Sequence, residues 1–267
     1  MSTTAYAPDA VVTPGSTTAS IPLGRVVRVE LRKMFNTRSG FWLMASIVIA
    51  GLLSTVATVL FAPDADLTYY TFAKAVGFPM TVILPIIAVL SITGEWSQRS
   101  GLTTFTLVPR RERVILAKVI ASMTVGVASM VFALALGVVG NVVGTAIAGT
   151  DLVWDVSLVH GLNIVIGSLL GLLSGTLLGV LFRSSAVALV AYFVGTLVVP
   201  SLFDLLASSQ KGFADTRGWV DVYFARSALF EGSLSGEQIA QLAVTVTVWM
   251  VLPGLVALRL AMKSEVK

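Results

Sequence analysis

The amino-acid sequence predicts an all-α, polytopic integral membrane protein with six transmembrane helices and an N-terminal amphipathic helix in the membrane interface. Of its 267 residues, 56% are hydrophobic and only 12% are charged, whereas a soluble domain usually carries about 25% charged residues. The mean hydropathy is +0.90. Two further observations support this fold class: the sequence contains six long apolar runs, and its basic residues gather on one side of them.

Residues 1–20 predict a disordered cytoplasmic tail. They are rich in Ser, Thr, Ala and Pro, and they contain neither the basic n-region nor the apolar h-region of a signal peptide. We expect residues 21–267 to form a single transmembrane domain.

The segment from Leu23 to Arg38 predicts a basic amphipathic helix that lies in the membrane interface. Its apolar residues share one face at helical spacing, and most of its basic residues lie off that face. The charged residues assigned to this interfacial helix are Arg28, Glu30, Arg32 and Lys33. The alternative is an ordinary positively charged flank of the first span.

Each apolar run is close to the roughly 20 residues that a spanning helix requires. The runs are about Phe41–Ala62, Ala75–Gly94, Val119–Val143, Gly161–Phe182, Ala186–Phe203 and Ile239–Leu258. Only residues 183–185 separate the fourth run from the fifth, which predicts a tight helical hairpin. The fifth run is short and is expected to end near Pro200.

The distribution of Lys and Arg predicts a multi-pass protein of the cell membrane with both termini in the cytoplasm. In this orientation the inner side holds five basic residues in the N-terminal segment, five in residues 95–118, one at Arg183 and three near the C-terminus. Only four of the 18 then lie outside. The outer segment 204–238 contains several aromatic residues, which predicts one or two short helices at the outer interface.

Four glycines recur at every fourth position along the fourth span, namely Gly167, Gly171, Gly175 and Gly179. Such a stripe of small residues lets another helix approach closely. Glycine is also common in membrane helices, but the register favours a packing surface. One candidate for the facing surface is the outer end of the third span, at Gly137, Gly140 and Gly144.

The sequence offers little for catalysis or ion coupling. It contains no cysteine and one histidine, and its spans hold almost no ionisable residues, which argues against a proton-driven carrier and an intramembrane hydrolase. Asp151, Asp155 and His160 cluster in the second outer loop, where a solvated loop is favoured over a metal or acid–base site. We expect no cofactor or metal on this chain. Nucleic-acid binding is not indicated either, because the basic residues flank apolar runs.

Residues 234–238, LSGEQ, are similar to the signature motif of ABC ATPase subunits. The sequence has no G-x-x-x-x-G-K-[ST] phosphate loop, and this segment is expected outside the cell, so we reject the similarity. The pattern predicts a capping box instead, with Ser235 as the N-cap and Gln238 three residues later, at the start of the sixth span.

The segment from Glu95 to Lys118 predicts a basic, structured cytoplasmic loop suited to binding another protein. It carries five basic residues against two acidic ones. Pro109 cannot continue a preceding helix but suits the first turn of a new one. We therefore expect a break at Pro109 and a helix from Arg110 through Lys118 into the third span.

Together these features resemble the membrane subunits of type-two ABC transporters, the ABC exporter permease family, over roughly Leu23 to the C-terminus. The resemblance rests on Glu30-Leu31-Arg32-Lys33 in the entry helix, the six-span layout, the outer segment and the pattern of the first inner loop. That pattern falls on Glu95, Arg99, Gly101, Thr103, Pro109, Arg113 and Lys118. Leu102 departs from it, because a Thr commonly follows the glycine.

In such permeases this loop carries the coupling helix that docks on an ATP-binding subunit. The resemblance therefore implies that partner, with ATP and Mg bound there, and an exporter. Six spans are half the usual complement, which implies a second permease copy or a sister permease, all in contact with membrane lipid. The alternatives are a non-transport assembly or sensor subunit that uses the outer segment and, after it, a membrane-embedded enzyme. The sequence does not name the substrate.

Overall fold

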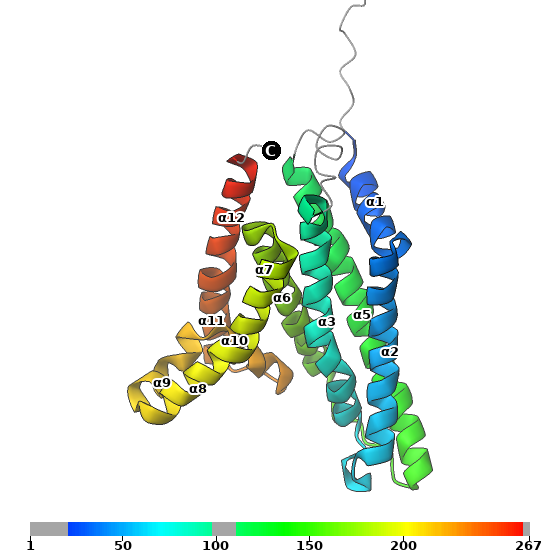
Figure 1. Ribbon diagram of the computed structural model, residues 1–267. Helices are drawn as coiled ribbons and strands as arrows, with labels where there is room; N and C mark the ends of the chain where they lie inside the picture. The colour runs from blue at the N-terminus through cyan, green and yellow to red at the C-terminus, as the bar shows by residue number, and fades with distance from the viewer. Residues whose placement is uncertain (1–20, 98–110, 264–267) are drawn as a thin grey trace, which may run out of the picture.

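The computed structural model describes residues 21–97 and 111–263 (Figure 1). Within these ranges every regular element is helical. Six helical segments are long and apolar enough to cross a membrane, as predicted. They are Arg38–Phe61, Tyr69–Gly94, Glu112–Ala148, Leu158–Phe182, Ser185–Ser209 and Gly236–Leu260. The all-α, polytopic fold class is therefore confirmed.

Helix α3 (Tyr69–Ser97) lies at the centre of the bundle. It packs against α2 (Arg38–Phe61), α5 (Arg111–Ala148) and α6 (Leu158–Phe182). Its apolar side chains are fully buried at many positions, among them Phe72, Met80 and Leu84. The two prolines of this span, Pro79 and Pro85, lie inside the helix without ending it. Dispersion contacts along α3 thus hold α2, α5 and α6 together.

Helix α1 (Leu23–Asn36) has the predicted amphipathic character and packs along the first turns of α5. Its buried residues are Val26, Glu30 and Met34, which repeat every four positions and so form one stripe. Val29 and Phe35, outside this stripe, are 48% and 52% exposed. This buried stripe therefore faces another helix and not the membrane interface.

The fifth span is longer than expected. Helix α7 (Ser185–Phe193) continues through a π-helical segment (Val194–Val198) into α8 (Val199–Ser209). Pro200 does not end the span, because it lies in the first turn of α8, where its missing N–H is tolerated. The segment that joins the fifth span to the sixth, named the outer connection after its predicted side, thus begins after Ser209 and not at residue 204.

The sixth span repeats this arrangement. Helix α11 (Gly236–Val246), a second π-helical segment (Thr247–Val251) and α12 (Leu252–Lys263) follow one another. Each π-helical segment ends two residues before a proline, Pro200 or Pro253. Proline leaves the carbonyl four residues before it without a helical donor, and that carbonyl lies inside the π-helical segment in both spans. The wider turn of a π-helix is a common adjustment at such positions.

Short helices fill the outer connection, as predicted. They are α9 (Lys211–Val220), α10 (Val222–Ser227) and a 3-10 turn at Ala228–Phe230. The next helix, α11, begins with the expected capping box: the Ser235 side chain accepts from the Gln238 N–H, and the Gln238 side chain accepts from the Ser235 N–H. A further 3-10 turn, Asp64–Asp66, joins α2 to α3.

Candidate functional site

Helix α1 and the first turns of α5 are joined by charged contacts. The Lys118 Nζ lies 2.5 Å from Glu30 Oε2, and the Lys33 Nζ lies 2.7 Å from Glu30 Oε1. Arg113 donates to the Ile21 carbonyl at 3.2 Å. Since these contacts run in the same order along both helices, α1 follows the first turns of α5 and is fastened at both its beginning and its middle.

Glu30 is an acidic side chain buried in this contact, with 3% of the residue exposed. Burial alone would raise the pKa of its carboxyl group, but the charge of Lys118 and the hydrogen bonds from Lys118 and Lys33 outweigh it and hold the pKa below the ordinary value. Glu30 is therefore ionised near neutral pH, as the ion pair requires.

The structure places only part of the predicted coupling set. Arg113 and Lys118 lie on α5, and α3 runs through Glu95, whose side chain lies outside the described residues. Arg99, Gly101, Thr103 and Pro109 lie wholly outside them. Lys118 turns inward, with 6% of its side chain exposed. Its described contact is within the chain, so it supports the base of α5 from inside.

Of the residues assigned to the interfacial helix, Arg28, Arg32 and Lys33 are exposed, whereas Glu30 is buried. Sequence patterning separates the basic residues from the apolar face correctly. It does not show that the acidic residue joins the buried face, because that depends on a lysine 88 positions away.

The glycine stripe of α6 is a packing surface, and it faces two different elements. A Cβ on Gly175 would lie 2.7 Å from the Pro85 carbonyl oxygen of α3, and one on Gly179 would lie 3.1 Å from Ile92 Cβ. Nearer the outer side, a Cβ on Gly167 would lie 2.7 Å from Phe230, and one on Gly171 would lie 2.8 Å from Arg226. The stripe therefore holds α6 against α3 at one end and against the outer connection at the other.

The suggestion that the third span faces this stripe is wrong. The three glycines suggested for this contact face α2 and α3 instead: a Cβ on Gly137 would meet Tyr69, and those on Gly140 and Gly144 would meet Phe72.

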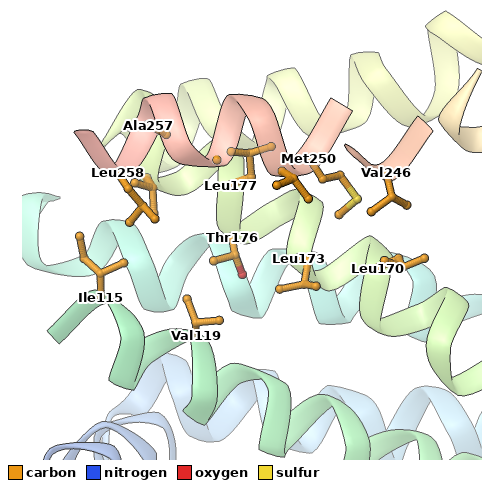
Figure 2. Close-up of a pocket in the computed structure, with 13 residues that line it drawn as sticks. Ile115, Val119, Leu170, Leu173, Thr176, Leu177, Val246, Met250, Ala257 and Leu258 are labelled. Atoms are coloured by element: carbon orange, nitrogen blue, oxygen red, sulfur yellow. The ribbon is translucent and has the colours of Figure 1, made fainter. Parts of the chain in front are cut away.

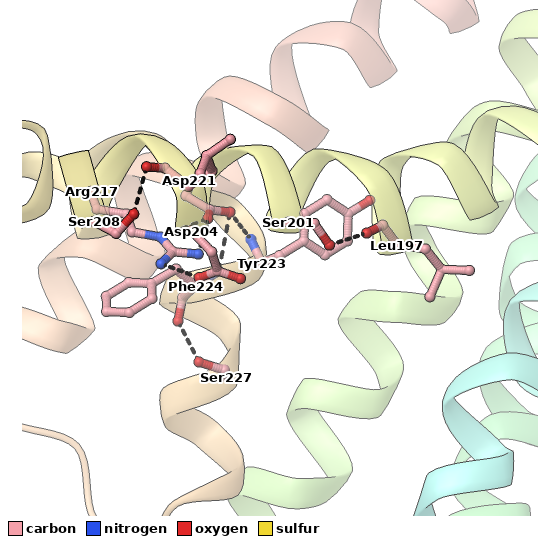
Figure 3. A network of polar contacts seen from close by, with 10 residues as sticks. Leu197, Ser201, Asp204, Ser208, Arg217, Asp221, Tyr223, Phe224 and Ser227 are labelled. Atoms are coloured by element: carbon pink, nitrogen blue, oxygen red, sulfur yellow. Dashed lines mark hydrogen bonds and ion pairs between the residues drawn. The ribbon is translucent and has the colours of Figure 1, made fainter. Parts of the chain in front are cut away.

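The outer connection is held by a network around Arg217, which Figure 3 shows between two carboxylates. Arg217 Nη1 lies 2.6 Å from Asp204 Oδ1, and its Nη2 lies 3.1 Å from Asp221 Oδ2. The guanidinium also lies over the Phe224 ring, 4.6 Å from its centroid. Asp221 in addition accepts from two backbone N–H groups as the N-cap of α10. The network therefore joins α8, α9 and α10.

Two members of the cluster predicted at Asp151, Asp155 and His160 make structural contacts. Asp155 accepts from the Tyr70 N–H at 2.7 Å, at the start of α3, and the ring of His160 lies 3.1 Å from the Phe230 carbonyl oxygen. Among the described residues, no group of three acidic, His or Cys side chains is arranged to hold a metal.

An apolar cavity of about 270 Å³ lies between α5, α6 and the last span (Figure 2). Its walls include Ile115, Leu173, Leu177 and Met250, and the one polar side chain among its lining residues is Thr176. That hydroxyl already donates to the Leu172 carbonyl at 3.1 Å. The cavity thus offers space to hydrocarbon but no polar group to orient a ligand.

These features define a polytopic helical membrane protein. The family model for ABC-2 family transporter proteins matches residues 26–199. Because that range covers more than half of the chain, the chain belongs to the ABC-2 transporter family, as the resemblance indicated. No curated protein matches the chain. The family match ends within the fifth span, so the outer connection and the last span are described by the structure alone.

Proposed function

We propose that the chain is the permease subunit of an ATP-driven ABC exporter and that the loop 95–118 docks on a separate ATP-binding subunit, which holds ATP and Mg. Family membership supports a permease. The observation that carries the coupling role is the fastening of α1 to the base of α5, which forms the C-terminal part of this loop segment.

Helix α5 is long enough to transmit a displacement at its base into the membrane. Its 38 residues span about 57 Å at 1.5 Å per residue, which exceeds the roughly 30 Å of a hydrocarbon core. The helix begins at Arg111, inside the segment 95–118, and Lys118 at the end of that segment ties it to α1 through Glu30. A displacement at the loop would therefore move α1 and the third span together as a rigid unit.

The buried Glu30–Lys118 pair reduces the set of residues proposed to contact the ATP-binding subunit. Lys118 meets Glu30 inside the chain, so the contact with the ATP-binding subunit falls to the rest of the predicted set. Those residues are Glu95, Arg99, Gly101, Thr103, Pro109 and Arg113.

We also propose that both termini face the cytoplasm of the cell membrane and that two permeases pair, either as two copies or with a sister permease. The last two spans support pairing, because few of their residues are buried within the chain. In the most apolar stretch of the fifth and sixth spans 11% and 6% of the residues are buried, against 44% and 50% in the second and fourth spans. A second permease would cover part of this exposed surface, and lipid the remainder.

The coupling proposal is tested by combining Arg113→Glu with Pro109→Ala. The double variant should reach the membrane at the wild-type level, but it should lose copurification of an ATP-binding subunit that carries a phosphate loop. Arg259→Glu is the control, because it reverses an exposed cation near the end of α12, outside the loop 95–118. Retention of the ATP-binding subunit by the double variant at the wild-type level would rule out this loop as the coupling element.

A further inference from the structure

Arg226 of α10 occupies an unusual position beside the middle of α6. Its Nη1 lies 2.8 Å from the position that a Cβ on Gly171 would take. Gly171 is 13 residues from the first residue of α6 and 11 from the last, or about 20 Å and about 16 Å along the helix axis. The short helix α10 therefore carries a cation to roughly the mid-depth of a spanning helix.

The described contacts of the Arg226 guanidinium are aromatic and not acidic. The guanidinium lies 5.5 Å from the centroid of the Tyr223 ring, and among the described residues it forms no ion pair with a carboxylate. Arg217, nine residues earlier, pairs with two. Charged side chains at such depth are costly and usually serve a function or bind a counter-charge. Arg226 is also partly exposed, so an anion can reach it.

The surrounding residues make room for this group and for two phenols. Tyr192 of α7 places its hydroxyl 3.9 Å from the same Gly171 Cβ position, and it donates to the Thr81 carbonyl of α3 at 3.0 Å. The Tyr223 hydroxyl lies 2.9 Å from the position of a Cβ on Gly195, in the π-helical segment of the fifth span. Figure 3 shows Tyr223 directed from α10 toward that span. Glycines of two spans thus admit one arginine and one tyrosine from the outer connection.

We propose that Arg226, with the Tyr223 hydroxyl beside it, binds the phosphate headgroup of an anionic amphiphile, and that such amphiphiles are the transported substrate class. A guanidinium carries five N–H donors in a planar fork that matches phosphate oxygens. Membrane depth favours a headgroup attached to acyl chains over a free ion. The binding site rests on the geometry alone, whereas the transport statement rests on the proposed permease function.

The binding test uses the purified full-length chain in nanodiscs of phosphatidylcholine, with fluorescent phosphatidylglycerol as the probe. Arg226→Gln should weaken phosphatidylglycerol binding by about tenfold or more, since a charge-assisted hydrogen bond is lost. Arg226→Lys should bind phosphatidylglycerol with an affinity between those of the wild type and Arg226→Gln, because lysine keeps the charge but lacks the planar set of N–H donors. Lys211→Gln is the matched control, because it removes an exposed outer cation of α9 and should leave binding unchanged.

A second variant guards against misfolding of Arg226→Gln. Gly171→Ala keeps every charge but displaces the guanidinium, and it should also weaken binding. Gly161→Ala, on the same helix with open space around it, should not. Wild-type binding in both Arg226→Gln and Gly171→Ala would overturn the site, as would an equal loss in Lys211→Gln.

Two further measurements separate the sources of the anion. Competition by millimolar inorganic phosphate as strong as that by phosphatidylglycerol would overturn the amphiphile and indicate a free anion. In proteoliposomes with the ATP-binding subunit, ATP-dependent movement of phosphatidylglycerol that Arg226→Gln abolishes is expected. If phosphatidylglycerol binds and the ATPase associates but no ATP-dependent movement occurs, the proposed substrate class is overturned. The site would then hold a bound lipid that is not transported. Failure to associate with any ATPase would instead overturn the proposed function, without affecting the binding result.

Discussion

Glu30 of α1 and Lys118 of α5 form an ion pair in which both side chains are almost fully buried, at 4% and 6% exposure. The residues lie 88 positions apart. Lys33 adds a second contact to the same carboxylate at 2.7 Å, and Met34 packs with Ala121 and Val125 just beyond it. The pair therefore fixes the register of the entry helix on the base of the third span.

Removing one partner of this pair should be more damaging than removing both. Glu30→Gln alone takes the carboxylate away from the buried Lys118, and Lys118→Met alone leaves Glu30 with the contact to the more exposed Lys33. Breaking a buried ion pair from one side in this way costs about 3–5 kcal/mol. The double variant should recover part of that loss, because no buried charge remains. Thermal unfolding in detergent measures all three variants. Additive losses in the double variant would show that the two side chains act independently.

The same pair predicts a pH dependence. Because the folded-state pKa of Glu30 is below its ordinary value of 4.5, its contribution to stability is fully present above that value and is lost as the pH falls through the lowered pKa. The contact between α1 and α5 should thus be unchanged from about pH 7 to about pH 5 and weaken only at lower pH. Melting temperatures across this range test the prediction, with the double variant as the reference that lacks the low-pH step.

Gly175→Ala should destabilise the bundle by about 1–3 kcal/mol, as overpacking usually does. The added Cβ would lie 2.7 Å from the Pro85 carbonyl oxygen, and backbone cannot yield as a flexible side chain can, so α6 and α3 must separate. Gly161→Ala is the control on the same helix, with nothing within 4 Å of the new Cβ. Melting temperatures in detergent compare the two, and equal stability would remove Gly175 from the packing surface.

Orientation is tested by single cysteines in this cysteine-free chain. Ser208→Cys, exposed at the end of α8, should react with a membrane-impermeant thiol reagent in intact cells. Ser100→Cys, in the inner loop, should react only after the membrane is opened. The expectation follows from the excess of basic residues on the side of residue 100. The reverse labelling pattern would invert the topology.

Local patterns in the sequence predict the local parts of this fold well. The six apolar runs, the amphipathic α1 and the capping box of Ser235 depend on residues within a few turns of each other, and all three are confirmed. The glycine spacing predicts a packing surface but not its partner. Nothing near Gly175 in the sequence indicates that it meets Pro85.

Features that depend on distant residues are not predictable in this way. Gly51 belongs to no regular repeat, yet a Cβ there would lie 3.0 Å from Leu136 of α5. Arg226 reads as an ordinary loop cation, and only the fold brings it beside Gly171. Pro200 suggests the end of a span, because the sequence gives no sign that a π-helical segment precedes it. A sequence search for an arginine beside a π-helical segment is not possible, because only the structure shows where the π-helical segments lie.

The two carboxylates of Arg217 should differ sharply in their effect on stability. Asp221 is fully buried and Asp204 is 65% exposed, so water can replace the Asp204 contact but not that of Asp221. Asp221 also accepts from the Tyr223 and Phe224 N–H groups at 2.9 and 3.1 Å, and loss of such a cap costs about 1 kcal/mol by itself. Asp221→Ala should therefore lower the melting temperature clearly and expose α9 and α10 to limited proteolysis from the outer side. Asp204→Ala is the matched control and should do little, because Arg217 keeps its contact with Asp221. Equal sensitivity of the two variants would mean that the exposed ion pair, and not the buried cap, holds the outer connection together.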